Sequence, residues 1–328
     1  MSAPLHPPLS FTWGQYVAGL VAERGGLAEL ARSLVEVAPA GVKLSDDPLT
    51  VERGLRRLRD LGSAPGGRYG RLLIRCFGIP GTISDWARRM GQYHSRLADL
   101  PVAVRHEQLR LWDRPPISES SVAAWVHLGL ASLAHRQRDA EQLDTRMSLA
   151  KLVARSAGPD ALMELALLQA RLAADRGEAD AAQGFLDAAG SALSELEAGE
   201  AACYLARLQD QRAYLTVRGW RKAPEHLDAA LALYAVIPID GPPFARFRRA
   251  HGEAWCLWKQ GRKDEALSAS RLAVQHAGDG GFVRMRILAL TLQGHILGRA
   301  EGGAVWMRAR EMAEALGDDL LTAKIPRR

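Results

Sequence analysis

The chain has 328 residues, 48% of them hydrophobic and 24% charged, and a formal net charge of +6 at pH 7. This composition excludes a wholly disordered chain, and the length predicts more than one structural unit. The mild basic excess favours acidic partners without naming nucleic acid. The three cysteines, Cys76, Cys203 and Cys256, lie far apart, which argues against a disulfide framework or a zinc site.

The opening residues, MSAPLHPPLSFTWG, contain no basic segment followed by an apolar one. No window approaches the roughly 18 uninterrupted apolar residues of a membrane span. We therefore expect a cytoplasmic protein without a membrane partner and with a flexible tail over residues 1–9. Strand signals are scarce, whereas Ala, Leu, Arg and Glu recur at helical spacing, which predicts an all-α fold.

Residues 10–98 form the first predicted unit, a compact domain of four or five short helices. Its order resembles the helix-turn-helix superfamily, particularly the winged form. The residues that carry the resemblance are a scaffold helix from Leu27 to Val35, a second helix beginning near Pro48, and the glycine-rich SAPGGRYG leading into RLLI. In this resemblance RLLI, residues 71–74, is the expected wing strand.

The second helix, TVERGLRRLRDLG, is well specified by its own residues. Asp47 is placed to cap it, Pro48 suits its first turn and Gly62 its end. Steps of 100° bring Val51, Leu55 and Leu58 to one buried face. The opposite face presents Arg53, Arg56 and Arg57.

Two explanations of these arginines remain open. Glu52 and Asp60 form helical acid–base pairs with them, worth about 0.2–0.5 kcal/mol each on an ordinary solvated helix, and Gly54 costs a helix about 1 kcal/mol relative to alanine. In a DNA reader the same side chains contact guanine edges or phosphates. The possible nucleic-acid face comprises Arg53, Arg56, Arg57, Arg59, Arg68 and Arg71, with Arg75 nearby.

A predicted linker, residues 99–117, contains the Pro115-Pro116 pair, and a repeated phrase follows over residues 118–328. The phrase is an apolar helix, a turn and a second helix with small side chains. Its anchoring alanines are Ala140, Ala182, Ala223, Ala266 and Ala304, at intervals of 42, 41, 43 and 38 residues. Such units bury their apolar faces only by stacking on one another.

The repeats resemble the tetratricopeptide repeat family, in a long-loop form common in bacterial regulators. The matching residues are Ala170 and Ala254 before the turns, Gly177 and Gly261 in the turns, and the pairs Ala182 with Ala189 and Ala266 with Ala273. The resemblance covers residues 118–318, with uncertain register in the first, third and fifth copies. It implies a right-handed solenoid whose first helices line a concave groove that binds a protein or peptide partner.

Carried onto the two well-registered copies, the resemblance assigns six side chains to the groove: Arg171, Arg248, His251, Trp255, Trp258 and Lys259. Tryptophan and arginine often dominate binding energy at interfaces, although either tryptophan could instead fill the core between repeats. An acidic peptide with an apolar anchor suits this set.

Catalytic signatures are missing: the chain has no phosphate-binding loop, HExxH, nucleophile elbow or EF-hand. The sequence therefore predicts no catalytic, cofactor or metal residues. The leading interpretation is a non-enzymatic interaction scaffold or regulator that binds a partner in the groove. The alternative is a DNA-binding transcription regulator whose repeats sense a ligand.

Overall fold

The computed structural model describes residues 10–39, 42, 44–45, 47–217 and 223–326. Within these ranges all regular secondary structure is helical and no strand is present, so the all-α prediction is confirmed. No helix of the described ranges is long and apolar enough to cross a membrane. The tail predicted at residues 1–9 lies outside them.

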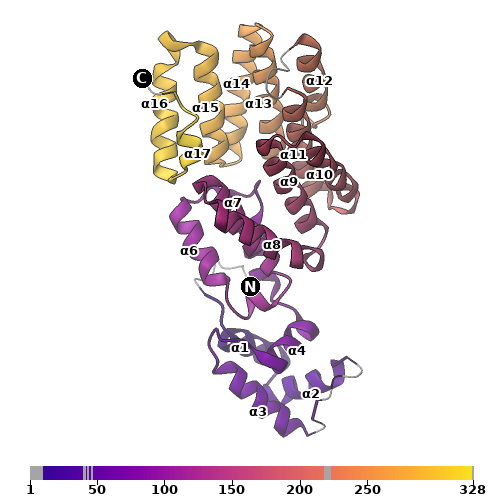
Figure 1. Cartoon of the computed structure of the whole chain (residues 1–328). Coiled ribbons are helices and arrows are strands. Elements are labelled where there is room, and N and C mark those ends of the chain that lie inside the picture. The colour runs from indigo at the N-terminus through magenta and orange to yellow at the C-terminus, as the bar shows by residue number, and fades with distance from the viewer. Residues whose placement is uncertain (1–9, 40–41, 43, 46, 218–222, 327–328) are drawn as a thin grey trace.

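An N-terminal unit of short helices forms the lower end of the molecule (Figure 1). Trp13, Leu30, Leu55 and Leu73, one from each of the first four helices, are fully buried and form part of one hydrophobic core. The four helices are α1 (Trp13–Arg24), α2 (Leu27–Val37), α3 (Pro48–Arg59) and α4 (Gly67–Phe77).

Helix α3 follows the sequence prediction. The Asp47 carboxylate accepts hydrogen bonds from the backbone N–H groups of Leu49 and Thr50, at 3.0 Å and 3.2 Å, and Pro48 occupies the first turn. The buried residues of the helix are the predicted stripe, Val51, Leu55 and Leu58. Local capping and the apolar stripe thus suffice to specify this element.

The wing strand expected at residues 71–74 is wrong, because this segment lies inside α4. Two glycines just before this segment, Gly66 and Gly70, are packing positions. A Cβ added to Gly66 or Gly70 would lie 2.2 Å or 2.7 Å from the Trp13 ring. The glycines therefore let α4 approach the Trp13 indole, and the segment needs no turn into a strand.

A connecting region follows. Helices α5 and α6 pack against α7, the first helix of the next region. The completely buried Arg105 of α6 donates from Nε to the Met90 carbonyl at 3.0 Å, so the segment predicted as a linker includes a packed helix. The elements are α5 (Gly81–Gly91), the 3-10 turn η1 (Arg96–Asp99), α6 (Val102–Trp112) and η2 (Ile117–Glu119).

In the upper part of the molecule the described residues form five antiparallel helix pairs and a final short helix. The first helices of the pairs are α7 (Ala123–Gln137), α9 (Pro159–Arg176), α11 (Ala198–Thr216), α13 (Pro243–Lys259) and α15 (Val283–Leu297). The second helices are α8 (Ala140–Ala157), α10 (Ala179–Ala192, extended by η3, Leu193–Glu195), α12 (Pro224–Ala235), α14 (Lys263–Asp279) and α16 (Arg299–Leu316). The last helix is α17 (Asp319–Thr322).

Four of the turns within the pairs, those that the structure describes, use positive φ. Gly177 and Gly261, the predicted turn glycines, have φ values of 95° and 80°. Gly298 has 85°, and Arg138 takes the same role at 59°. Because glycine reaches positive φ without strain, the short connections at Gly177, Gly261 and Gly298 have a local cause.

The structure also gives the register of the second helices. Their fourth and eleventh residues face inward, which confirms Ala182 with Ala189 and Ala266 with Ala273 as buried pairs. Ala140 and Ala304, by contrast, are exposed, so they are not packing positions. The corresponding residues in the other three pairs are Leu143 with Ala150, Leu227 with Tyr234, and Gly302 with Ala309.

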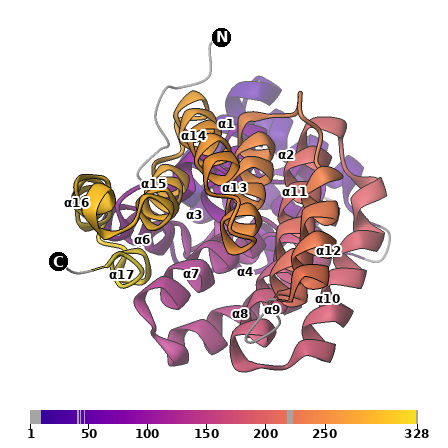
Figure 2. The same cartoon turned by 90° about the horizontal axis from the view of Figure 1, so that it is seen from above.

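The five pairs stand side by side along a curve, and the curve closes (Figure 2). Each first helix contacts the next first helix, from α7 through α15, and α17 contacts both α15 and α7. The first helices and α17 therefore surround a central space, with the second helices outside them. We call this arrangement the helical ring.

Candidate functional site

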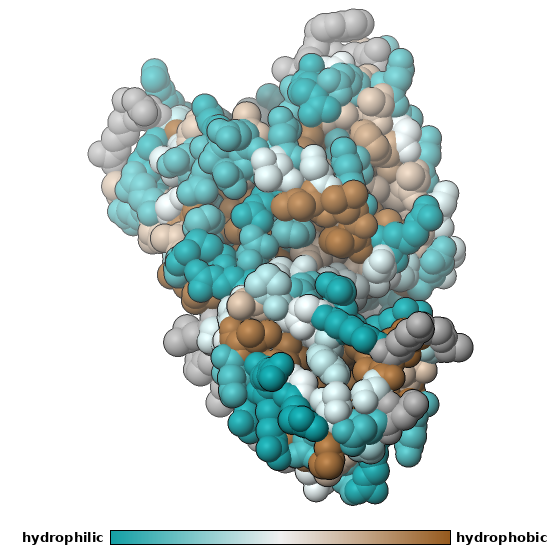
Figure 3. Space-filling view, turned by 60° about the horizontal axis from the view of Figure 1, so that its bottom comes forward, coloured by the Kyte–Doolittle hydropathy of each residue, from teal (hydrophilic) through white to brown (hydrophobic). Residues whose placement is uncertain are grey.

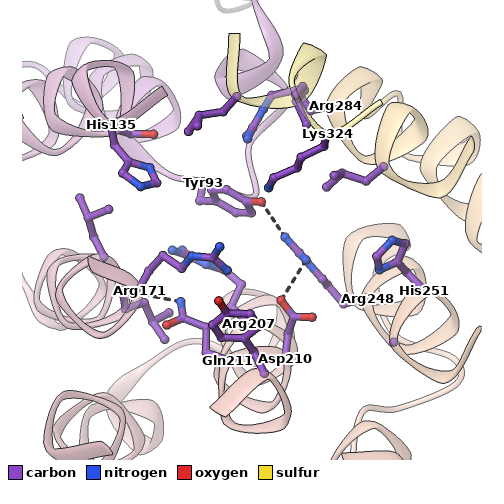
Figure 4. A pocket seen from close by; sticks show the side chains of 18 of the residues that line it. Tyr93, His135, Arg171, Arg207, Asp210, Gln211, Arg248, His251, Arg284 and Lys324 are labelled. Atoms are coloured by element: carbon purple, nitrogen blue, oxygen red, sulfur yellow. Dashed lines mark hydrogen bonds and ion pairs between the residues drawn. The ribbon is translucent and has the colours of Figure 1, made fainter. Parts of the chain in front are cut away.

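The helical ring encloses a cavity of about 360 Å³. The side chains of the first helices and of the α17 region line it, joined by Tyr93 from the segment between α5 and η1 (Figure 4). The cavity thus combines elements from the whole length of the ring with one residue of the connecting region.

Cationic side chains dominate the lining. Six of them face only two lining carboxylates, Asp210 and Asp318. The cationic residues are Arg136, Arg171, Arg207, Arg248, Arg284 and Lys324.

Two of these arginines are neutralised by acids outside the lining set. The buried Arg207 donates from Nη2 to Glu164 Oε1 at 2.8 Å, and burial of such a pair requires this close geometry. Arg171 donates from Nε to Asp175 Oδ2 at 3.1 Å and lies over the Tyr214 ring. These two side chains therefore add little net charge to the cavity.

The remaining guanidinium groups share few acceptors. Arg248 donates to Asp210 Oδ2 at 2.9 Å and to the Tyr93 hydroxyl at 2.7 Å. Asp318, only 1% exposed, accepts from Arg284 Nε at 3.2 Å and lies 3.9 Å from Arg136 Nε. The Asp318 carboxylate thus lies near arginines of both α7 and α15, the two helices that α17 contacts.

Several donors of this group have no hydrogen-bond acceptor among the described residues. They are Nη2 of Arg136, Nε of Arg248 and Nη1 of Arg284, in side chains that belong to residues only 3%, 7% and 7% exposed. A buried polar group without a partner costs about 1–3 kcal/mol, and a charged one costs more. The protein's own acceptors are too few for these arginines.

The pKa values of neighbouring groups reflect this positive field. Burial raises the pKa of Tyr93, but the charges of Arg248 and Arg284 outweigh it and lower the pKa to about 8. Burial, followed by repulsion from Arg284, lowers the pKa of Arg136 well below its usual range. Burial and then Arg248 lower the pKa of His251 to about 4.

The rest of the wall is apolar or aromatic. It offers indole, phenol and aliphatic surface beside the charged groups. These residues are Leu167, Leu168, Tyr214, Val217, Tyr234, Trp255, Leu288, Leu320 and Leu321. A ligand with an anionic group and an apolar part would match both kinds of wall.

Four of the six predicted groove residues line the cavity: Arg171, Arg248, His251 and Trp255. Trp258 and Lys259 are not among the lining residues. The Trp258 ring instead stacks on His295 with centroids 5.7 Å apart, and Lys259 Nζ lies 3.5 Å above the Trp258 ring.

Sequence reasoning missed Tyr93, Arg136, Arg284 and Lys324. One of them carried a signal. Arg248 lies 15 residues before Lys263, the start of α14, and Arg284 lies 15 residues before Arg299, the start of α16. If the last pair is aligned in its correct register, Arg284 occupies the position of Arg248 and is predicted to line the cavity as Arg248 does. Tyr93 precedes the repeats and had no such marker.

The six arginines of the possible nucleic-acid face, together with Arg75, are all exposed on α3 and α4. Figure 3 shows hydrophilic surface over this part of the N-terminal unit. Arg56 pairs with Glu52 as expected, and Arg59 lies 3.4 Å from Asp60. These surface pairs are worth little, so they leave the face free to bind an anion.

Known proteins give no direct lead, since neither the protein-family models nor the curated proteins compared with the chain contain a match. Among the described residues, no group of three or more His, Cys, Asp or Glu side chains is arranged to hold a metal ion. The function must be argued from the cavity and the arginine face.

Proposed function

We propose that this chain is a non-enzymatic regulatory protein, similar to tetratricopeptide repeat proteins, that binds a short acidic segment of a peptide or protein partner inside the helical ring. The supporting observation is the surplus of cationic groups in the cavity. Buried guanidinium groups from α7, α13 and α15 have N–H donors without a hydrogen-bond acceptor among the described residues. An anionic partner would satisfy them by charge-assisted hydrogen bonds.

The size of the cavity supports a short segment. At about 360 Å³ it lies near the lower end of the roughly 300–1,000 Å³ typical of ligand pockets. A few residues of a partner fit in this space, whereas a folded domain does not. Trp255 and the tyrosines of the wall offer the aromatic contacts that often anchor such segments.

The test compares two pools of fluorescently labelled tetrapeptides with the full chain. One pool combines Asp or Glu with one Leu or aromatic residue, and the other replaces every acid by its amide. We expect the acidic pool to bind at least tenfold more tightly. Arg171→Gln leaves the Asp175 carboxylate without its arginine, and Trp255→Ala removes an aromatic part of the wall. Each should weaken that binding by about tenfold, as measured by fluorescence anisotropy.

Trp258→Ala provides the matched control, because Trp258 lies one helical turn from Trp255 and does not line the cavity. It should bind the acidic pool like the unmodified chain. Equal binding of the two pools, or unchanged binding by folded Arg171→Gln and Trp255→Ala proteins, would contradict the proposal.

A second candidate function is binding of duplex DNA by the N-terminal unit, with the helical ring as the ligand sensor. The observation that favours it is the seven exposed arginines on two adjacent helices. Arginines in such clusters neutralise phosphates and release counterions, which makes binding fall steeply as salt rises.

We test this candidate with the full chain, duplex DNA and an Arg53/Arg56/Arg57→Ala variant. The unmodified chain should bind at low salt. In a plot of log affinity against log salt concentration, the slope of the variant should be shallower by roughly 0.9 for each phosphate contact removed. A control removes equal charge from exposed positions of the ring, Arg155, Arg262 and Arg299. If both variants bind DNA equally, or if the unmodified chain does not bind, this candidate fails.

A further inference from the structure

Tyr93, Arg136, Arg248 and Arg284 form a compact group in the cavity wall, which we call the Tyr93 cluster. Figure 4 shows Tyr93, Arg248 and Arg284 of this cluster. The Tyr93 ring lies 5.3 Å from the Arg248 guanidinium carbon and 5.1 Å from that of Arg284. Both arginines reach it from first helices of the ring. The phenol of Tyr93, from the connecting region, therefore lies against cationic side chains of the helical ring.

The Tyr93 hydroxyl accepts a hydrogen bond from Arg248 Nη2. A phenol can accept and donate at the same time, so its own hydrogen remains available for an acceptor in the cavity. Arg248, through its second bond to Asp210, holds the hydroxyl in place. The geometry therefore presents an oriented O–H donor beside fixed positive charge.

The charges of the cluster are incompletely balanced. Three guanidinium groups face the carboxylates of Asp210 and Asp318, which leaves one positive charge in excess. Asp99, whose carboxylate accepts from the Arg284 backbone N–H, is opposed by the fully buried Arg105. One excess charge suits a monoanion better than a dianion such as phosphate.

A fourth cation, Lys324, lies at the edge of this group. The Lys324 side chain points toward Tyr93 in Figure 4, and it comes from the segment after α17. Burial, followed by the charges of Arg171 and Arg284, lowers the pKa of Lys324, so the ammonium group is in the same positive field. It can approach an anion that the cluster holds.

Resting on the proposed function, we propose that the Tyr93 cluster, together with Lys324, binds a carboxylate group of the occupant and that the apolar part attached to it packs against Tyr214 and Trp255. The carboxylate accepts from the Tyr93 hydroxyl and from N–H groups of the arginines of the cluster, which line the cavity. Its single negative charge offsets the one excess charge of the three arginines, and Lys324 adds a further positive charge at the edge of the site. The carboxylate can come from a peptide side chain, from a peptide C-terminus or from a small organic acid.

The experiment uses probes that differ only in the carboxylate. With the full chain, binding of 3-phenylpropanoate and of 3-phenylpropanamide is measured by calorimetry. The tetrapeptides selected above are compared with forms in which the C-terminus is amidated or Glu is replaced by Gln. We expect the acid to bind at least tenfold more tightly than the amide, and one of the two peptide changes to cause a similar loss, which identifies the source of the carboxylate.

Two conservative variants test the roles of Tyr93 and Lys324 in binding the carboxylate. Tyr93→Phe keeps the ring and removes the donor, and Lys324→Met keeps the length and removes the charge. Each should weaken 3-phenylpropanoate binding severalfold and leave 3-phenylpropanamide binding unchanged. Lys151→Met, at an exposed position of the outer helix α8, should change neither.

The outcomes separate the two proposals. If the acidic tetrapeptides bind more tightly than their amide forms but Tyr93→Phe and Lys324→Met leave that preference unchanged, the carboxylate site is wrong while the cavity remains a site for acidic peptides. If inorganic phosphate competes at lower concentration than 3-phenylpropanoate, the site prefers a dianion and the carboxylate assignment is overturned. If 3-phenylpropanoate binds and no tetrapeptide does, the carboxylate site stands and the peptide function falls.

Discussion

The arginines inside the helical ring keep their positions through shared carboxylates. Asp318 alone holds Arg284 and stands near Arg136, and Asp210 holds Arg248. In a poorly solvated interior, like charges repel much more strongly than in water. These guanidinium groups therefore repel one another, and an anion bound as we propose would reduce that repulsion.

His251, on the same wall, has a testable effect on stability. Its pKa is about 4 in the folded protein because of burial and the charge of Arg248, against about 6.5 in an unfolded chain. As pH falls below 6.5, the unfolded chain binds a proton that the folded protein does not, so the contribution of this group is present above pH 6.5 and is lost toward pH 4. Asp210 and Lys324 also act on the ring, in opposite directions.

We expect the melting temperature of the unmodified chain to fall more between pH 6.5 and 4.5 than that of His251→Asn, which has no proton to gain. Differential scanning calorimetry across this range measures the difference. Parallel curves for the two proteins would show that His251 is not kept neutral by its surroundings.

At the scale of single residues, the two well-registered repeat copies predicted four of the cavity residues, but Trp258 and Lys259 of the same copies do not line the cavity. Arg171, Arg248, His251 and Trp255 came from the two well-matched copies. Arg284 was missed because the last copy was aligned on the exposed Ala304, two residues beyond the buried Gly302. Tyr93 was missed because contacts between the connecting region and the ring have no sequence period.

Among the helices, α15 and α16 approach each other closely at a pair of glycines. A Cβ on Gly302 would lie 2.3 Å from the Gly294 carbonyl oxygen, whereas one on Gly303 meets nothing within 4 Å. The obstacle at Gly302 is backbone, so the helices would have to separate. Gly302 is therefore needed for the close approach of the two helices, whereas Gly303 is not.

We expect Gly302→Ala to lower the free energy of unfolding by about 1–3 kcal/mol, as overpacking does. Gly303→Ala should raise it by about 0.5–1 kcal/mol through helix propensity. Urea unfolding followed by circular dichroism measures both. A stabilised Gly302→Ala protein would disprove the close approach of the two helices.

At this scale the sequence predicted α3 almost completely, since its cap and apolar stripe are local signals. It failed for α4, where the glycines of SAPGGRYG suggested a turn and a strand. Those glycines accommodate the Trp13 ring, which lies more than 50 residues away in the sequence. Gly54 has a similar cause, because a Cβ there would meet the Tyr69 ring of α4 at 2.3 Å. The structural role of such glycines therefore depends on a packing partner that is distant in the sequence.

For the whole molecule, periodicity predicted the row of helix pairs, because each pair must cover the apolar face of the next. It did not predict that the row closes on itself. Closure depends on α17, a four-residue helix outside the repeated phrase, and on Asp318, which caps it by accepting from the Leu321 N–H at 3.1 Å. The same carboxylate holds arginines of α7 and α15, so ring closure and the charge of the cavity are linked.

This link leads to a prediction for Asp318→Asn. Asparagine also caps helices, so the substitution removes the charge and leaves α17 its cap. Arg136 and Arg284 would remain buried with one carboxylate fewer, and breaking a buried pair in this way costs about 3–5 kcal/mol. Because the lost contact joins α17 to α7 and α15, we expect a lower melting temperature, a larger radius of gyration in X-ray scattering and faster proteolysis near the C-terminus. Asp319→Asn, at the next and exposed position, should change none of these. Equal effects of the two substitutions would mean that Asp318 does not close the ring.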